Sequence, residues 1–169
     1  RLNASVFYFS MDNQQLTSVG GDSNTARLLN ADETNGYGFE LDSEFMVTDD
    51  LSVTASVSYN HTTLNDDSLF VPVCALCSVN DEVVDGRALV DGNSLPHAPE
   101  WIFATTARYA KEMANGEVYV FTDWYYRDEI NFFLYESSEF TGDALLEGGV
   151  RLGYSWFSGD TEYDVGIFG

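Results

Sequence analysis

Basic residues are scarce in this chain: 7 lysines and arginines stand against 28 aspartates and glutamates, which gives a formal net charge of −21 over 169 residues. A nucleic-acid-binding surface needs a positive patch that displaces counterions from phosphates, and no stretch of this sequence supplies one. The same excess of negative charge disfavours docking onto an anionic membrane surface. We therefore expect no nucleic-acid partner.

Long apolar runs are also absent. No stretch of about 18 apolar residues exists, so the sequence predicts no transmembrane helix. Arg1 opens directly into an amphipathic pattern with no signal peptide ahead of it, and we expect the chain to be processed or to be a piece of something longer.

Cysteine is limited to one pair, Cys74 and Cys77. A redox-active pair of this spacing would sit at a helix N-terminus after a strand, whereas this one lies between Pro72 and a polar, acidic stretch. We expect instead a small disulfide that staples a loop in an oxidising compartment.

The dominant pattern that is present is alternation, clearest in Leu51–Tyr59, where apolar residues hold the odd positions and small hydroxyl residues the even ones. This pattern predicts a strand that is wetted on one face only. Similar alternation recurs and predicts an all-β fold, an antiparallel up-and-down meander of about seven strands. The expected strands are about Leu2–Leu16, Ala26–Val47, Leu51–Thr63, Pro99–Met113, Glu117–Phe133, Leu146–Trp156 and Thr161–Gly169.

The connections between these strands alternate in length. Tight turns are expected at Thr48–Asp50, Ala114–Gly116 and Ser158–Asp160, with longer loops after the first, third and fifth strands. The longest, Leu64–Ala98, exceeds what a compact domain normally contains without a functional reason. Soluble sandwiches have no reason to sort loops by length, but outer-membrane barrels do, so we expect a partial transmembrane β-barrel.

Charge and aromatic positions agree with a barrel. Charged residues fall on the faces opposite the apolar ones, where a water-filled lumen holds them better than a dry core. The expected lumen charge network is Glu40, Asp42, Glu44, Arg108, Asp123, Arg127, Glu147 and Arg151, joined by Glu162 and Asp164. The first three repel one another along one strand, so we expect Arg108, Arg127 and Arg151 as their partners. Two aromatic girdles are expected, Tyr109, Trp156 and Tyr163 near the turns and Tyr59, Trp101, Trp124 and Tyr126 toward the loops.

Several segments resemble one family. Asn35-Gly-Tyr-Gly-Phe-Glu-Leu41, then Leu51–Tyr59, and a loop that closes in Leu95-Pro-His-Ala-Pro99 resemble the barrel of TonB-dependent outer-membrane receptors. Asp123-Trp-Tyr-Tyr-Arg127 and the segments Gly148–Tyr154 and Tyr163–Gly169 look like the closing strands of that family.

The resemblance implies a barrel of about 22 strands, filled by an N-terminal plug, in the outer membrane of a Gram-negative bacterium. Such receptors take up ferric siderophores, cobalamin or other scarce nutrients with energy from a TonB partner. On this basis residues 1–169 are expected to be the C-terminal portion of a larger barrel, without its plug and last strand. The implied partners are the lipid bilayer, the remainder of the barrel and plug, the TonB complex and a small-molecule ligand.

Ligand binding is the function that the residues favour. Aromatic side chains toward the long loops offer flat surfaces for a siderophore, a cobalamin or a sugar. The candidates are Trp101, Tyr125, Tyr126, Phe132, Phe133 and Tyr135.

Other chemistry has little support. No G-x-S-x-G motif is present, and we expect neither an enzyme nor a cofactor. His61 and His97 match no metal-ligand spacing, and the acidic stretches around Asp66 and Asp81 lack the EF-hand pattern, so we expect solvated acidic loops and no metal site.

Two alternatives stay open. The first alternative to a receptor portion is a self-contained secreted β-sandwich that acts as a binding module or adhesin. The second is one subunit of an outer-membrane barrel that several short chains assemble. A sandwich requires the apolar faces to pack on each other and the charged faces to point outward.

Overall fold

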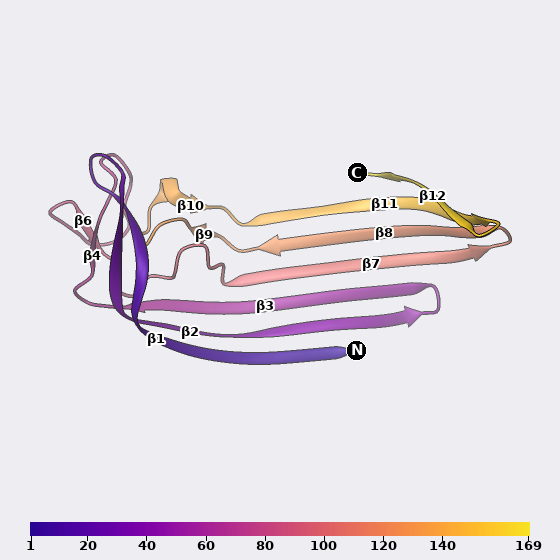
Figure 1. Ribbon diagram of the computed structural model, residues 1–169, viewed down its shortest axis with the longest axis horizontal. Helices are drawn as coiled ribbons and strands as arrows, with labels where there is room; N and C mark the ends of the chain where they lie inside the picture. The colour runs from indigo at the N-terminus through magenta and orange to yellow at the C-terminus, as the bar shows by residue number, and fades with distance from the viewer.

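The computed structural model describes all 169 residues and is built on one antiparallel seven-stranded sheet (Figure 1). The sheet order is β1-β2-β3-β7-β8-β11-β12, so each long strand lies beside its neighbours in the chain and the predicted meander is confirmed. The sheet is open, with β1 and β12 as its two edges. Its strands are β1 (Leu2–Gly20), β2 (Thr25–Thr48), β3 (Leu51–Asn65), β7 (Trp101–Met113), β8 (Gly116–Arg127), β11 (Leu145–Ser158) and β12 (Thr161–Phe168).

The connections are sorted between the two ends of the sheet. The three tight turns, of two residues each, lie at one end, called here the turn end. At the other end, the loop end, lie the long connections from β3 to β7 and from β8 to β11, together with the tip of the β1–β2 hairpin (Figure 1). The longer loop predicted after the first strand is wrong, because the two strands continue to a four-residue turn at residues 21–24. Successive connections fall at opposite ends because each strand of a meander reverses the direction of the one before it.

The loop end contains short elements that the sequence did not predict. Within the connection from β3 to β7, strands β4 (Phe70–Pro72), β5 (Val83–Val84) and β6 (Arg87–Leu89) form a small separate sheet in the order β4-β6-β5. Strands of two or three residues are too short for a period of two to be visible in sequence.

The fifth predicted strand was too long. The β8 ladder ends at Arg127, and the carboxylate of Asp128 then accepts the Glu129 N–H at 3.0 Å, a local bond that competes with the ladder. The following residues form β9 (Ile130–Asn131), which pairs with β10 (Thr141–Gly142), and the helical turn η1 (Ser138–Phe140) lies between them.

The hairpin of β1 and β2 extends beyond the rest of the sheet and bends over the loop end (Figure 1). The bend coincides with Asn13, whose φ of 53° interrupts the ladder between the pairs Asp12–Glu33 and Gln14–Ala31. At the hairpin tip the Gly21 N–H donates to the Val73 carbonyl at 2.9 Å. A Cβ on Gly20 would lie 1.9 Å from the Pro72 carbonyl oxygen, so this contact requires glycine.

The buried core lies in the loop end and not in the sheet. The loop cluster, defined as residues 14–31, 66–100 and 128–144 together with Leu64, encloses seven buried apolar residues. These are Ala31, Leu64, Val71, Ala88, Val90, Leu134 and Tyr135. Leu16 and Leu29 of the bent hairpin pack against them, which joins three connections into one unit.

The rest of the sheet is a single layer. Only 17 of 169 residues are buried, and the accessible surface of 10688 Å² exceeds the roughly 8,300 Å² of a globular monomer of this mass. Apolar faces that packed on each other would remove that excess surface. The β-sandwich alternative is therefore wrong. No helix in the structure has the length and apolar character needed to cross a bilayer.

Candidate functional site

The strand register gives the sheet two chemically different faces. On one face, here the apolar face, Leu41, Val57, Phe103, Tyr126 and Leu146 form a row across five neighbouring strands. Val6 and Ile167, near the two edges of this face, are 85% and 72% exposed. Residues one position along each strand point to the opposite face, here the polar face.

Hydroxyl groups on the apolar face are bonded within the sheet. Ser43 donates to the Ala55 carbonyl at 2.9 Å, and Thr105 donates to the Thr54 carbonyl at 2.9 Å. Thr122 donates to the Gly149 carbonyl at 2.8 Å. A surface in contact with hydrocarbon requires this internal satisfaction, because no water is available there to accept the bonds.

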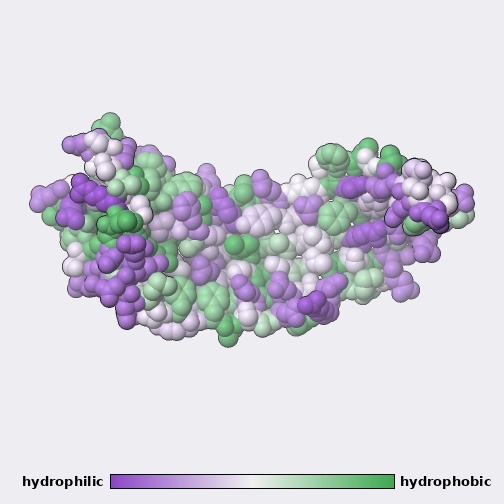
Figure 2. Space-filling model, viewed as in Figure 1, coloured by the Kyte–Doolittle hydropathy of each residue, from purple (hydrophilic) through white to green (hydrophobic).

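Aromatic rings form bands at both ends of the apolar face. Toward the loop end, the Tyr59 and Trp101 ring centroids are 4.7 Å apart, and Trp101 stacks on Phe103 at 5.6 Å. Toward the turn end, Trp156 lies between Tyr154 and Tyr163 at 5.6 and 5.5 Å. In the view of Figure 2, strongly hydrophilic residues gather at the two ends of the molecule and also along its lower edge near the N-terminus. Apolar surface between two aromatic bands is the surface pattern of a transmembrane barrel.

The polar face carries a compact charge network toward the turn end. Arg108 pairs with Glu117, and Arg151 pairs with Asp164. The Tyr119 hydroxyl donates to Asp164 at 2.8 Å, and its ring lies 5.2 Å from the Arg108 guanidinium and 5.7 Å from that of Arg151. These five side chains line an open hollow of about 570 Å³. Charges so arranged suit a water-filled space rather than a packed core.

The predicted ion pairs of Glu40, Asp42 and Glu44 were wrong. No salt bridge joins these carboxylates to Arg108, Arg127 or Arg151, and Glu40 instead accepts the Ser5 hydroxyl at 3.2 Å. Arg127 donates to the Asp128 backbone carbonyl at 2.9 Å. The physical reason is distance. Strand β3 lies between β2 and the strands that carry the arginines, and it places only Ser and Thr opposite these carboxylates. Neighbouring strands are about 4.8 Å apart, so each carboxylate is at least two strand spacings from an arginine strand.

The loop cluster is held by carboxylates that accept internal hydrogen bonds. Asp66, which is 7% exposed, accepts the Asp32 N–H at 3.0 Å and both the N–H and the hydroxyl of Ser68 at 3.1 and 2.9 Å. Burial alone would raise the pKa of Asp66, but these hydrogen bonds outweigh burial and hold the pKa below its ordinary value. Because the ladder is interrupted at Asn13, the Asp32 N–H has no partner on β1, and it donates to the Asp66 carboxylate instead.

A second carboxylate, Asp81, joins two connections. It accepts the Asn93 side-chain amide at 3.1 Å and the Glu136 N–H at 2.7 Å. Burial, together with the charges of Asp81 and Glu129, raises the pKa of the Glu136 carboxyl. The acidic loop residues therefore act as anchors for the loop fold, and no group of three or more His, Cys, Asp or Glu residues is placed to hold a metal ion.

Both histidines contact neighbouring side chains of the chain. His61 Nδ1 lies 2.7 Å from a Glu100 carboxylate oxygen, and the His97 ring packs against Phe132 at 5.4 Å between centroids. Cys74 and Cys77 form a disulfide, and Cys77 packs against the core of the loop cluster.

These features have a match among known families. The family described as TonB dependent receptor-like, beta-barrel, matches residues 1–158. The chain belongs to this family.

A solved receptor barrel has the same fold. The ferric yersiniabactin uptake receptor FyuA from Yersinia pestis superposes with a TM-score of 0.59 at 13% sequence identity. The alignment covers 99% of this chain and 26% of FyuA, so the chain spans about a quarter of the length of that receptor. No curated protein sequence matches this chain.

The six predicted ligand-binding aromatics of this receptor-family chain do not form one site. Trp101 and Tyr126 lie on the apolar face, and Phe103 lies between them in contact with both rings. Tyr125 points to the polar face. Phe133 and Tyr135 belong to the loop cluster, 5.6 Å apart, with Tyr135 only 1% exposed, and Phe132 is exposed beside His97.

Sequence reasoning missed two structural features of this receptor-family chain. The pairing of Tyr119 with both arginines depends on a diagonal contact across three strands, which no single strand pattern reveals. The role of Asp66 depends on a freed backbone N–H on β2, although its Asp-x-Ser spacing is a signal for a local turn.

Proposed function

We propose that this chain is part of an outer-membrane TonB-dependent transport receptor of a Gram-negative bacterium, which takes up a scarce nutrient such as a ferric siderophore. The observation that carries the proposal is the family match over residues 1–158 on a single-layer sheet with one apolar and one polar face. The apolar face contacts lipid, the polar face lines the lumen, and the loop end faces the cell exterior.

Residues 1–169 form the C-terminal portion of the barrel in this proposal. The edge strands β1 and β12 each leave one row of backbone N–H and C=O groups without a partner strand. In hydrocarbon every such group costs several kcal/mol, so the remaining strands of the receptor must close the barrel. The plug fills the lumen, and the TonB complex acts through the plug-bearing part of the receptor.

The ligand class rests on two features. The solved receptor with the same fold is named for ferric yersiniabactin uptake, which supports an iron chelate as the nutrient. The exposed Phe132 beside His97, and Tyr125 on the polar face, are the predicted aromatics of this chain that remain available to a ligand from the exterior or the lumen.

Iron uptake by cells tests the proposal. A strain without the complete gene is compared with the parent strain for accumulation of radiolabelled iron from the siderophores that the organism uses, with and without a functional TonB. The proposal predicts uptake that needs both the gene and TonB. Equal uptake in all strains, for every siderophore and for cobalamin, contradicts it.

The intact mass of the native polypeptide separates one receptor chain from a barrel that several short chains assemble. The proposal predicts a mass several times 18.8 kDa. A mass near 18.8 kDa favours the assembly of short chains.

A further inference from the structure

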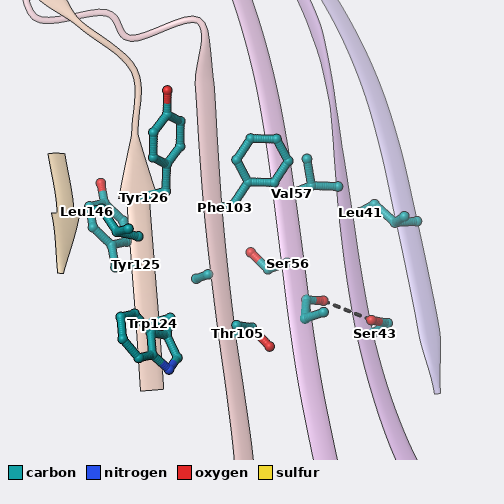
Figure 3. Close-up of a pocket in the computed structure, with 12 residues that line it drawn as sticks. Leu41, Ser43, Ser56, Val57, Phe103, Thr105, Trp124, Tyr125, Tyr126 and Leu146 are labelled. Carbon is teal, nitrogen blue, oxygen red and sulfur yellow. Dashed lines mark hydrogen bonds between the residues drawn. The ribbon is translucent and has the colours of Figure 1, made fainter. Parts of the chain in front are cut away.

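A shallow groove of about 510 Å³ crosses the apolar face in the half nearer the loop end (Figure 3). Its floor is a row of small side chains, Ser43, Ala55 and Thr105, on three neighbouring strands. Along one side stands the row that contains Leu41, Val57 and Phe103, and Trp124 closes one end (Figure 3).

The groove is chemically apolar although two of its floor residues carry hydroxyls. The Ser43 and Thr105 hydroxyls both donate to backbone carbonyls at 2.9 Å, which leaves their carbon atoms toward the open side. The Trp124 indole N–H is also bonded internally, to the Thr122 hydroxyl at 2.9 Å. No charged residue lines the groove. A ligand with polar or charged groups would find no partner here, so the groove suits a hydrocarbon chain.

Position along the strands sets the depth in the membrane. Ala55 lies four residues from Tyr59 of the loop-end aromatic band, which is about 14 Å along a strand and about 10 Å along the membrane normal at a barrel tilt near 40°. Aromatic bands mark the membrane interface, and the apolar band of such barrels is about 25 Å tall. The groove therefore lies in the hydrocarbon region of the leaflet nearer the loop end, where lipid acyl chains surround the barrel.

From this geometry we infer that the groove binds one fatty acyl chain of a lipid in that leaflet, laid obliquely across β2, β3 and β7. The groove is continuous with the lipid-facing surface of the proposed function, on which the inference rests. Lipid tails are as apolar as the groove, so the selectivity comes from packing: the chain contacts the floor, the Phe103 side and Trp124 at once, whereas a flat wall offers one surface.

Photolabelling of the intact receptor tests the inference. The receptor is reconstituted into phosphatidylethanolamine vesicles that contain a trace of the same lipid with a diazirine on one acyl chain, and the labelled peptides are mapped after illumination. The wild-type receptor is expected to carry at least threefold more label on groove residues, such as Phe103 and Trp124, than on Val150 of the same face, which is 48% exposed and lies outside the groove. Uniform labelling of the face would overturn the inference.

Filling the floor gives the matched comparison. Ala55→Leu fills the groove, whereas Ala107→Leu adds the same side chain in the next row of the same face, outside the groove. We expect groove labelling to fall at least threefold in Ala55→Leu and to stay at the wild-type level in Ala107→Leu. Equal labelling in both variants, or a protein–protein cross-link at the groove in place of the lipid adduct, overturns the inference.

Two controls keep the outcome unambiguous. Resistance of the folded barrel to unfolding in detergent without heating confirms assembly of each variant, and Thr105→Leu replaces Ala55→Leu if that variant does not assemble. If the apolar face does not contact lipid as proposed, the labelling result is different, because no position on that face would then be labelled. Failure of the transport proposal appears only in the uptake assay.

Discussion

Replacement of Asp66 by Asn is expected to loosen the loop cluster without unfolding the barrel. The carboxylate accepts three hydrogen bonds from Asp32 and Ser68, one on Oδ2 and two on Oδ1. An asparagine keeps one acceptor oxygen and turns an N–H toward a donor on the other side. At least one charge-assisted bond is lost and one buried N–H is left unsatisfied, which amounts to about 2–3 kcal/mol.

Hydrogen exchange at the Asp32 amide of the intact receptor reads out this change. A loss of about 2–3 kcal/mol corresponds to roughly 30- to 150-fold faster exchange, if the amide exchanges by local opening of the loop cluster. Asp67→Asn is the matched control, because it removes the same charge from an exposed neighbour for which no hydrogen bond is found. Exchange that is equal in Asp66→Asn, Asp67→Asn and wild type would refute the role assigned to Asp66.

The pH dependence has a definite sign. The folded pKa of Asp66 lies below its ordinary value, so its contribution to stability is fully present above the unfolded pKa. The contribution is lost as pH falls through the folded pKa. The difference in Asp32 amide protection between wild type and Asp66→Asn is therefore expected to shrink as the solution is acidified, and a difference that grows on acidification would contradict the assignment.

Two further predictions concern the sheet. Val57→Arg places a charge on the apolar face and is expected to destabilise the barrel by up to about 2–4 kcal/mol, the cost of an arginine at the bilayer midplane. Ser56→Arg, on the polar face, is expected to be tolerated. Denaturant titrations in lipid compare the two variants, and equal effects would argue against the assignment of the faces. Gly153→Ala puts a Cβ 2.3 Å from the Tyr119 ring and should displace the ring, at a cost of about 1–3 kcal/mol in barrel stability. A Cβ at Gly149 meets no atom closer than 3.5 Å, so Gly149→Ala is the control, and the same titrations should show a loss of stability in Gly153→Ala alone.

Local patterns accounted for the sheet but not for the loop end. The period of two in Leu51–Tyr59, and the turn residues around Asn115 and Gly159, were sufficient to predict the meander, its register of faces and the three tight turns at one end of the sheet, but not the four-residue turn that ends the β1–β2 hairpin. Each of these features depends on residues that are close together in the chain. The same patterns could not predict β4–β6, because two- and three-residue strands form only after the loops have packed together.

The charge network was likewise predicted only in part. The alternation of side chains along each strand was enough to place Arg108 and Arg151 on the polar face. Their partners, however, depend on which strands are neighbours and on how far a side chain extends diagonally across the sheet. Glu117 and Asp164 are those partners because they lie on the adjacent strands β8 and β12, whereas Glu40 lies on β2, across β3. The candidate ligand aromatics were dispersed for a similar reason, since position near a loop does not specify a face.

The most direct test of the central claim is the thiol reactivity of single cysteines along β3 in the intact receptor, in outer membranes. Six substitutions, at Ser52, Val53, Thr54, Ala55, Ser56 and Val57, are treated with a water-soluble thiol reagent that does not enter the bilayer and is small enough to enter the lumen. The account predicts alternation, with reaction at the even positions and protection at the odd ones. Equal reaction at all six positions, or faster reaction at the odd positions, would contradict a sheet with one face in lipid and the other in water.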